Sequence, residues 1–369
     1  MRNSMSIVTI NLQFAFIPSL AKGDFPLACV KIPLRDSPHQ NSPFVTGNAF
    51  KLDCNYNPKM QAKESKLGGT PLIHAKKLGD FLKVNRLYVK YEGTNPTGTQ
   101  KDRPASLHVK KALEEKYDTI VVGSCGNYGA AIAHYASLSG LKSRVYVPKE
   151  FHSPRLEEIK EMHGAELILV PGKYEDSVEM SKKDARENNW FDANAGAYPD
   201  LGLLAYSRIS TELFESMGEI PDAVSVPVGN GTTLAGVYKG FFDLRESNKT
   251  KKLPRIIAAS TDGGNPVIES FIRGQKEITD FPVERIKETE INEPLVNYRS
   301  YDGDLAFKAV IDSGGTAEYV TDGELSEYHT LLKKYERIDA IPAATASIAA
   351  IAHFVKRNNN GTFVAIVTG

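Results

Sequence analysis

The sequence predicts an α/β protein built from open, twisted, parallel-type sheets with flanking helices. From Asp118 onward, short apolar segments alternate with longer segments of helical composition, and this alternation is typical of parallel sheets covered by helices. Glycine-rich turns follow several of the apolar segments. Because ligands of such sheets bind at the carboxyl ends of the strands, we expect the functional site at these turns.

Each predicted element has a local signal. Arg86–Tyr91 alternates and is rich in β-branched and aromatic residues, which predicts a strand. Ser153 and Pro154 are typical of the N-cap and the first position of a helix. Further predicted strands are Thr119–Val122, Ser143–Val147, Glu166–Val170 and the last apolar run from Val364, and predicted helices are Ala105–Glu115, Gly129–Leu138, Ser153–His163 and Tyr174–Asn188. The longest predicted loops are 248–254 and 274–301.

Length and charge limit the class of protein. With 369 residues the chain can form two domains and a sizeable core. Its 45 basic and 45 acidic residues give a net charge of zero, so no electrostatic footprint for nucleic acid is expected. No apolar run approaches the ~20 residues of a membrane span. We therefore predict a globular protein that binds neither nucleic acid nor membranes.

The three cysteines, Cys29, Cys54 and Cys125, lie far apart in the sequence. An odd and sparse set argues against a disulfide framework and fits a reducing cytosol, so a cytoplasmic location is expected. Cys54 has no second cysteine at metal-ligand spacing, which predicts no metal site. The first 18 residues lack the clean apolar segment of a signal peptide.

The run Glu92–Arg103 joins the predicted strand Arg86–Tyr91 to the predicted helix Ala105–Glu115, and it contains the turn dipeptides Asn-Pro and Thr-Gly. It holds Lys101 at or near a helix N-terminus, where the helix dipole disfavours an ammonium. Burial would disfavour the ammonium further. A neutral amine in this place could attack a carbonyl and form a Schiff base. The alternative is an ordinary solvated lysine in a polar turn.

Two further glycine-rich turns follow predicted strands. Gly123–Gly129 and Gly229–Thr233 each precede a predicted helix, so their N–H groups and the helix dipole favour an anion. The first turn lacks the Gly-x-Gly-x-x-Gly spacing of dinucleotide-binding folds. The second turn is not followed by the lysine of a nucleotide-binding loop. A phosphate other than that of a dinucleotide or ATP is therefore expected.

Together these turns carry a resemblance to a known family. The run Asn95–Arg103 resembles the Asn-Pro-Thr-Gly-Ser-Phe-Lys-Asp-Arg motif of threonine synthases, with Thr99-Gln100 where Ser-Phe is usual. These enzymes belong to fold type II of the pyridoxal 5'-phosphate (PLP) enzymes, the tryptophan-synthase-β fold. The resemblance covers about Leu67 to Gly369 and implies that Lys101 forms a Schiff base with PLP. It also implies that Arg103 tethers the active-site turn.

The same resemblance implies roles for other residues. Asn127 would hydrogen-bond the 3'-oxygen of the cofactor, and Thr368 would face its pyridine nitrogen. The cofactor phosphate would lie in a cup made of Gly229, Asn230, Gly231, Thr232 and Thr233. The substrate carboxylate would be bound by the turn that contains Ser124, Cys125 and Tyr128, with Cys125 and Tyr128 standing where serine and threonine are usual.

The resemblance also suggests an organisation. We expect residues 1–66 to be an N-terminal extension packed on the core. Residues 67–103 and 205–369 would form a large cofactor-binding domain, and 104–204 a smaller, mobile, substrate-side domain with the cofactor in the cleft between them. Relatives of this kind imply a homodimer.

The expected reaction is elimination or replacement at Cβ or Cγ of an activated amino acid, a small-molecule substrate. Threonine synthases use O-phosphohomoserine and carry a lysine before the second glycine-rich turn that this chain lacks, which leaves Arg155 and Arg208 as candidate phosphate ligands. An alternative is β-replacement or dehydration of serine, O-acetylserine or O-phosphoserine, as in cysteine or cysteate synthases. An alternative from another class is a catalytically silent PLP-binding protein that acts by interaction.

Overall fold

The structure, a computed structural model, describes residues 67–124, 126–150, 154–356 and 361–369. All of them belong to one compact unit, Asn55–Gly369. The expectations for residues 1–66, for the Ser153 N-cap and for Cys125 therefore lie outside the described residues.

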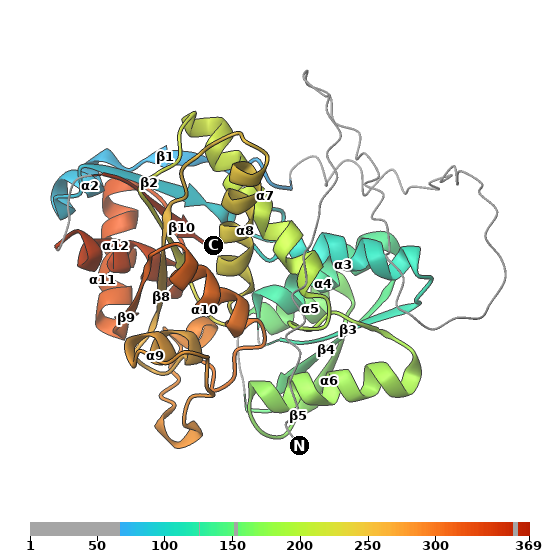
Figure 1. The fold of residues 1–369 in the computed structure, drawn as a ribbon. Helices are drawn as coiled ribbons and strands as arrows, with labels where there is room; N and C mark the ends of the chain where they lie inside the picture. The colour runs from blue at the N-terminus through green and yellow to red at the C-terminus, as the bar shows by residue number, and fades with distance from the viewer. Residues whose placement is uncertain (1–66, 125, 151–153, 357–360) are drawn as a thin grey trace, which may run out of the picture. The chain divides into compact units, whose positions relative to one another are not determined.

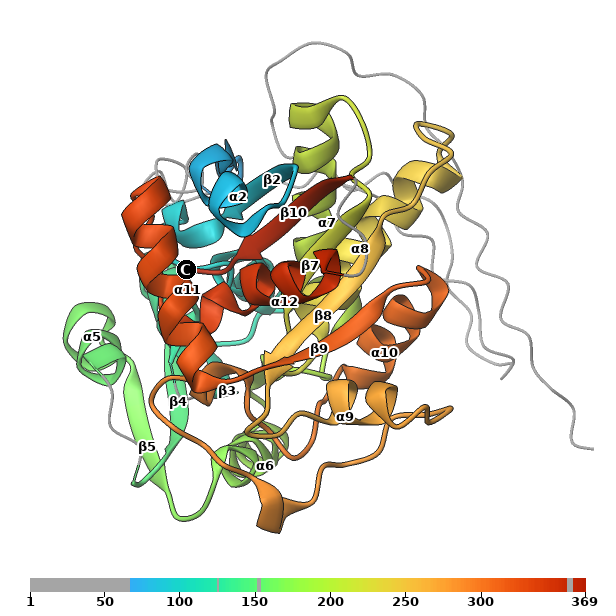
Figure 2. The ribbon, with the colours of Figure 1, turned by 90° about the vertical axis from the view of Figure 1, so that its left-hand side faces the viewer.

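The larger sheet has six strands in the order β1-β2-β10-β7-β8-β9. β1 (Leu72–His74) pairs antiparallel with β2 (Arg86–Tyr91), and every other pair is parallel. The remaining strands are β7 (Ala223–Pro227), β8 (Arg255–Thr261), β9 (Thr316–Val320) and β10 (Thr362–Val367). The last strand of the chain thus lies between two earlier ones, as Figure 2 shows.

The smaller sheet has four parallel strands in the order β5-β4-β3-β6. These are β3 (Thr119–Gly123), β4 (Lys142–Pro148), β5 (Glu166–Val170) and β6 (Phe191–Asp192). Its strands form a group separate from those of the larger sheet (Figure 1). All of them fall inside residues 104–204, which we continue to propose as the smaller domain.

Helices cover both faces of each sheet. One face of the larger sheet shares a core with α2 (Lys76–Leu82), α11 (Asp322–Glu336) and α12 (Ala346–Val355). Its other face packs on α7 (Pro199–Met217), α8 (Thr232–Glu246), α9 (Pro266–Ile272) and α10 (Gly303–Asp312). The smaller sheet packs on α3 (Asp102–Glu114), α4 (Asn127–Ser139) and α5 (Pro154–His163), with α6 (Tyr174–Asn188) on its other face. Short 3-10 turns are η1 (Glu92–Thr94), η2 (Val283–Arg285), η3 (Glu293–Leu295) and η4 (Pro342–Thr345).

The predicted fold class, an α/β protein with two open parallel-type sheets, is confirmed. The predicted strands at 86–91 and 166–170 and the helix at 174–188 have the expected bounds. α3 begins three residues earlier than predicted, at Asp102, so Lys101 immediately precedes it. Residues 274–301 contain only the short turns η2 and η3, as expected for a long loop. Along the described ranges, no helix combines the length and the apolar character needed to cross a membrane.

Candidate active site

Three neighbouring strands of the larger sheet end at the same edge. β2 leads into the Lys101 turn, β10 into Thr368, and β7 into the turn Gly229–Thr233. Because β2, β10 and β7 are adjacent and parallel, their carboxyl ends lie together. The backbone N–H of Gln100 donates to the carbonyl of Thr368 at 3.0 Å. Segments that are more than 100 residues apart in the sequence therefore meet at one place.

These strand ends border a cavity of about 570 Å³ that also reaches the strand ends of the smaller sheet. Most of the residues predicted for the site line it: Lys101, Ser124, Asn127, Tyr128, Arg155, the turn 229–233 and Thr368. Among the residues that the structure describes, no group of His, Cys, Asp and Glu side chains could hold a metal ion.

Lys101 lies against this cavity. Its Nζ is 5.7 Å from the centre of the Tyr128 ring. Burial lowers the pKa of Lys101 to about 8, although the nearby Asp302 carboxylate acts in the opposite direction. At pH 7 such an amine is roughly 10% neutral, whereas an ordinary lysine is roughly 0.03% neutral. The environment of Lys101 thus favours a nucleophilic amine, as its place in the sequence suggested.

The Lys101 turn is closed on itself by the next residue. The Asp102 carboxylate accepts hydrogen bonds from the backbone N–H of Thr97 at 2.8 Å and from its hydroxyl at 3.0 Å. Burial raises the pKa of Asp102 to about 6 against the effect of these bonds. The two hydrogen bonds between Asp102 and Thr97 therefore stabilise the short loop that carries Lys101.

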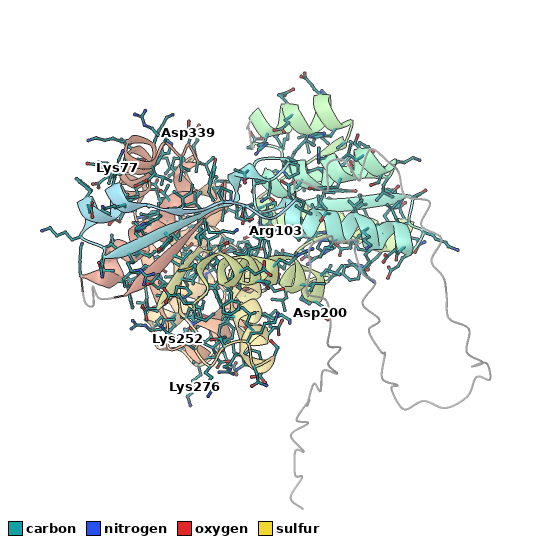
Figure 3. The ribbon with its side chains drawn as sticks, turned by 90° about the horizontal axis from the view of Figure 1, so that it is seen from above. Lys77, Arg103, Asp200, Lys252, Lys276 and Asp339 are labelled. Carbon is teal, nitrogen blue, oxygen red and sulfur yellow. The ribbon has the colours of Figure 1, made fainter. Side chains whose placement is uncertain are left out.

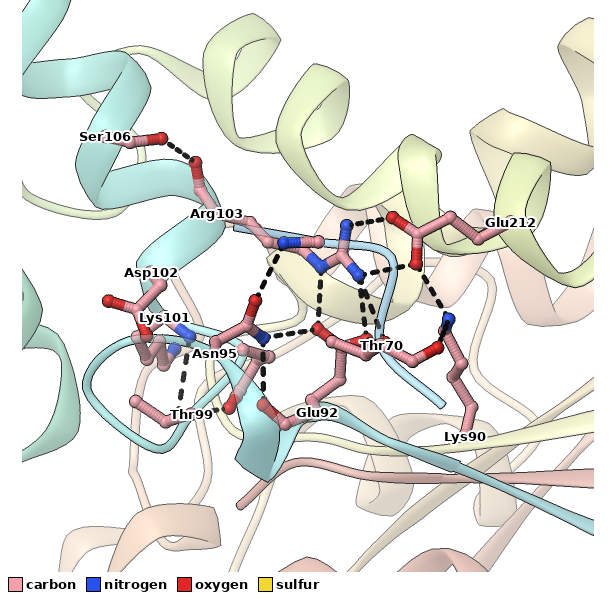
Figure 4. Close-up of polar contacts among 12 residues, drawn as sticks. Thr70, Lys90, Glu92, Asn95, Thr99, Lys101, Asp102, Arg103, Ser106 and Glu212 are labelled. Carbon is pink, nitrogen blue, oxygen red and sulfur yellow. Dashed lines mark hydrogen bonds and ion pairs between the residues drawn. The ribbon is translucent and has the colours of Figure 1, made fainter. Parts of the chain in front are cut away.

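Arg103 ties this turn to the larger sheet through buried charges (Figure 4). Its Nε lies 2.6 Å from Glu92, and its Nη1 lies 2.8 Å from Glu212 of α7. Lys90 of β2 adds a second cation 2.7 Å from Glu212. Burial would raise the pKa of Glu212, but Arg103 and Lys90 hold it at about 2.

The position of Arg103 fits the tethering role that the resemblance implied. It is 3% exposed and lies inward, whereas Lys77, Lys252, Lys276 and Asp339 lie around the outside of the structure (Figure 3). Its guanidinium joins η1, which precedes the turn, to α7, which packs on the sheet. The backbone on both sides of Lys101 is therefore fixed.

The turn Gly229–Thr233 forms a cup at the N-terminus of α8. The first N–H groups of a helix have no partner inside it, and they attract an anion. Gly231 has a φ of 95°, and a Cβ there would lie 2.8 Å from the Ala306 Cβ and 2.9 Å from the Asp302 carbonyl oxygen. A side chain could not be accommodated without displacing the start of α10. Glycine is therefore required by both conformation and space.

The smaller sheet contributes a second helix N-terminus, that of α4. The Ser124 hydroxyl accepts the N–H of Gly129 at 2.9 Å, so it caps the helix. Asn127 accepts a hydrogen bond from Arg155 Nε at 3.0 Å. Arg155 also donates to the Thr97 carbonyl at 2.9 Å, which connects this wall to the Lys101 turn.

Comparison with known proteins identifies the family. The family model described as "Pyridoxal-phosphate dependent enzyme" matches residues 64–369. This chain belongs to the PLP-dependent enzymes.

Individual relatives place this PLP-dependent enzyme more closely. It is 31% identical to threonine synthase of Methanocaldococcus jannaschii over 309 residues, which are 82% of this chain and 74% of that protein. It is 30% identical to threonine synthase of Methanosarcina acetivorans over 310 residues, with the same coverage. The processed form of threonine deaminase isoform 2 from Solanum lycopersicum has a similar fold, with a TM-score of 0.68, 18% identity, and coverage of 85% of this chain and 83% of that one. The predicted resemblance to threonine synthase-like enzymes of fold type II is confirmed.

The residues of this PLP-dependent enzyme fit its cofactor. The cup 229–233 suits a phosphate, because a side chain at position 231 would crowd Ala306 and Asp302, and the first N–H groups of a helix such as α8 have no partner inside it. Lys101 offers an amine whose lowered pKa suits bonding to an aldehyde. Thr368 lies at the end of β10, beside the Lys101 turn. These placements agree with the roles that the resemblance implied, and we retain those roles as proposals.

One predicted substrate ligand is not part of this assembly. Arg208 is exposed on α7 and does not line the cavity. Residues two positions apart on a helix are separated by about 200° around its axis. Because Tyr206 lines the cavity, Arg208 lies on the opposite side of α7. We therefore remove Arg208 from the proposed site. Cys125 lies outside the described residues.

Sequence reasoning missed several residues that line the cavity: His108, Tyr174, Asn194, Tyr198, Tyr206 and Asp302. No local motif in the sequence marks them. His108 lies two turns after Lys101 on α3, and helical spacing from Lys101 is the signal that could have found it. Burial lowers the pKa of His108 to about 4, so its imidazole is neutral near pH 7.

Proposed function

We propose that this PLP-dependent enzyme is a threonine synthase-like lyase or synthase. It performs elimination or replacement at Cβ or Cγ of an activated amino acid, for which O-phosphohomoserine is one candidate. The observation that carries this proposal is Lys101 in a shared cavity with the anion cup of residues 229–233. A silent binding protein of this family would have no need of an amine with a lowered pKa.

The bound cofactor supplies an aldehyde that bonds to amines and a ring that withdraws electrons. Lys101 would hold this aldehyde through its amine, and the same amine would serve as the base for the proton on the substrate Cα. Asn127 would hydrogen-bond the ring oxygen, and the hydroxyl of Thr368 would hold the ring nitrogen. Because a hydroxyl does not hold that nitrogen protonated as a carboxylate would, elimination and replacement are favoured over transamination. The N-terminus of α4 binds the substrate carboxylate.

A spectrum of the cofactor-supplemented protein tests the proposal. We expect an absorbance band at ~410–420 nm that changes when an amino-acid substrate is added. Release of phosphate from O-phosphohomoserine, coupled to threonine formation, would identify a threonine synthase. Absence of the band would contradict the proposed enzyme and would favour the alternative, a catalytically silent binding protein.

A second candidate is a β-replacement synthase or dehydratase that uses serine, O-acetylserine or O-phosphoserine. One observation favours it: Arg208 is turned away, which leaves Arg155 as the single arginine among the described residues that line the cavity. A stable spectral change with serine derivatives and none with O-phosphohomoserine would support this candidate. We also propose a homodimer, which the family resemblance implies, and a cytoplasmic location, which the sparse cysteines suggest.

A further inference from the structure

His108 of α3 and Tyr128 of α4 form a hydrogen-bonded pair in the wall of the cavity. The Nδ1 atom of His108 lies 2.8 Å from the hydroxyl oxygen of Tyr128 and 2.9 Å from the carbonyl oxygen of Pro104. Tyr128 stands where threonine is usual in the family, and its longer side chain carries the hydroxyl across to α3. The pair is therefore a feature of this chain rather than of the family motif.

The Pro104 carbonyl decides which nitrogen of His108 carries the proton. A carbonyl oxygen can only accept, and two acceptors without a proton between them would repel at 2.9 Å. Nδ1 therefore carries the proton and donates it to Pro104 and, in the same three-centre arrangement, to the oxygen of Tyr128. A protonated Nδ1 has no lone pair that could accept the proton of Tyr128.

His108 keeps this single proton near neutral pH. It is 5% exposed, and its Nε2 is buried without a partner among the residues that the structure describes. The ring centres of Phe191 and Tyr198 lie 6.1 Å and 6.2 Å from that of the imidazole. A second proton, on Nε2, would be a buried donor without an acceptor, and burial lowers the pKa of His108 to about 4. The imidazole is therefore a fixed, neutral donor to Tyr128.

The proton of the Tyr128 hydroxyl is consequently available to a ligand. Within the described residues, this hydroxyl has its one hydrogen bond with His108. The side chain is partly exposed and borders the cavity. Desolvation by the surrounding walls raises the pKa of Tyr128 well above its usual range, so the hydroxyl stays protonated. The wall thus presents a permanent, neutral hydrogen-bond donor.

This donor lies close to the amine that would hold the cofactor. Lys101 Nζ is 5.7 Å from the centre of the Tyr128 ring. An amino acid that exchanges with Lys101 brings its own nitrogen to this place, and its carboxylate carbon is two bonds from that nitrogen. The carboxylate would therefore come within reach of the Tyr128 hydroxyl, beside the N-terminus of α4. A hydrogen bond to a charged acceptor is stronger than one between neutral groups.

Resting on the proposed function, we propose that His108 is a positioning residue for substrate binding. By donating from Nδ1 to the Tyr128 oxygen, it turns the Tyr128 proton toward the cavity, where the hydroxyl donates it to the substrate carboxylate. Tyr128 contacts the substrate, and His108 acts through Tyr128 alone. Helix α3 thereby takes part in recognition of the amino acid, together with the turn before α4.

The protein without added amino acid offers a first test. When its histidines are labelled with ¹⁵N, the signal that disappears in His108→Leu identifies His108 among the eight histidines of the chain. We expect a neutral ring that is protonated at Nδ1 at pH 7, which the nitrogen chemical shifts and ring couplings report. A ring protonated at Nε2 would overturn the proposal, because Nδ1 would then accept the proton of Tyr128.

Titration of the cofactor-loaded protein with glycine and with methylamine isolates the carboxylate contact. Glycine carries the amine and the carboxylate that all amino-acid substrates share, whereas methylamine lacks the carboxylate. The change of the cofactor band measures half-saturation. Tyr128→Phe should raise the half-saturating glycine concentration at least ~10-fold, and His108→Leu should raise it ~5-fold. Neither variant should change the value for methylamine more than ~2-fold.

A double variant distinguishes positioning from packing. If His108 acts through the Tyr128 hydroxyl, adding His108→Leu to Tyr128→Phe should raise the glycine value less than ~2-fold further. A further loss as large as in the single variant would overturn the proposal. Tyr117→Phe is the matched control, because Tyr117 packs on the same Phe191 ring, at 5.5 Å between ring centres, but does not line the cavity. It should leave both half-saturating concentrations within ~2-fold of the parent.

Failure of this inference differs from failure of the proposed function. A protein without the cofactor band would contradict the proposed function, and the proton position on His108 would still be measured. An intact band that responds to glycine equally in the parent and in Tyr128→Phe contradicts the inference alone. A parent band that glycine leaves unchanged does the same, because the shared carboxylate would then not be bound.

Discussion

The cofactor side and the substrate side of the cavity are built differently. On the cofactor side, Lys101, Thr368 and the cup follow three adjacent strands. A backbone hydrogen bond joins the Lys101 turn to Thr368, and the buried charges of Arg103 hold that turn. On the substrate side, side chains come from α3, α7, the α4 turn and a long loop that contains only short turns. The difference teaches that the proposed cofactor residues sit at the ends of regular strands, whereas the facing wall is assembled from helices and a long loop.

The largest effect is expected when Lys101, at the centre of the cofactor side, is replaced. Lys101→Ala should remove the band at ~410–420 nm and reduce turnover at least ~10³-fold, because the bonding amine and the proposed base are lost together. Circular dichroism should stay unchanged. Lys110→Ala, at a more exposed position on α3, the helix that Lys101 precedes, is the control and should keep both signals. A band that survives in Lys101→Ala would refute the assignment of this lysine.

The next effect concerns what holds the Lys101 turn in place. Arg103→Ala should lower the free energy of unfolding by ~3–5 kcal/mol, because Glu92 and part of Glu212 would stay buried without their partner. The urea midpoint measures this loss. Arg86→Ala, which removes an exposed pair with Glu219, should leave the midpoint unchanged. Similar losses in both variants would show that the buried cluster has no special role.

A smaller effect sharpens the role of the phosphate cup. Gly231→Ala should cost ~1–3 kcal/mol of stability, through its positive φ and its contacts with Ala306 and Asp302, and should weaken PLP binding. Gly218→Ala has a similar φ of 68° but open space around the added Cβ. It should cost ~1 kcal/mol and leave cofactor affinity unchanged. Fluorescence titration with PLP separates the two variants, and equal affinities would contradict the proposed cup.

The smallest effect is the pH dependence of cofactor uptake. Because burial lowers the pKa of Lys101 to about 8, its neutral fraction in the apoprotein rises as pH increases toward 8 and levels off above it. The rate of band formation should therefore increase ~10-fold per pH unit below this value and then reach a plateau. A rate that still rises steeply above pH 9 would indicate an ordinary, solvated lysine.

Local signals were enough for much of the fold and of the cofactor side. Alternating residues predicted the strand at 86–91, a short apolar segment between two helical ones predicted the strand at 166–170, and glycine-rich turns marked the cup and the α4 N-terminus. The strand at 72–74 and helix α2 were not predicted, because three residues of strand and seven of helix give little periodicity. Arg208 was proposed because it lies in the region that corresponds to the lysine-containing run of threonine synthases, but on α7 it is exposed and lies away from the cavity.

The sequence by itself determined that a lysine precedes a helix and that two glycine-rich turns can bind anions, since these properties depend on neighbours along the chain. Only the tertiary structure decided that β10 enters between β2 and β7, which brings Thr368 to Lys101. It alone gathered Glu288, Glu290, Glu293 and Asp302 around one cavity with His108. The reason is physical: hydrogen-bonded strand order and side-chain burial depend on contacts between distant segments, and no local pattern of residues encodes those contacts.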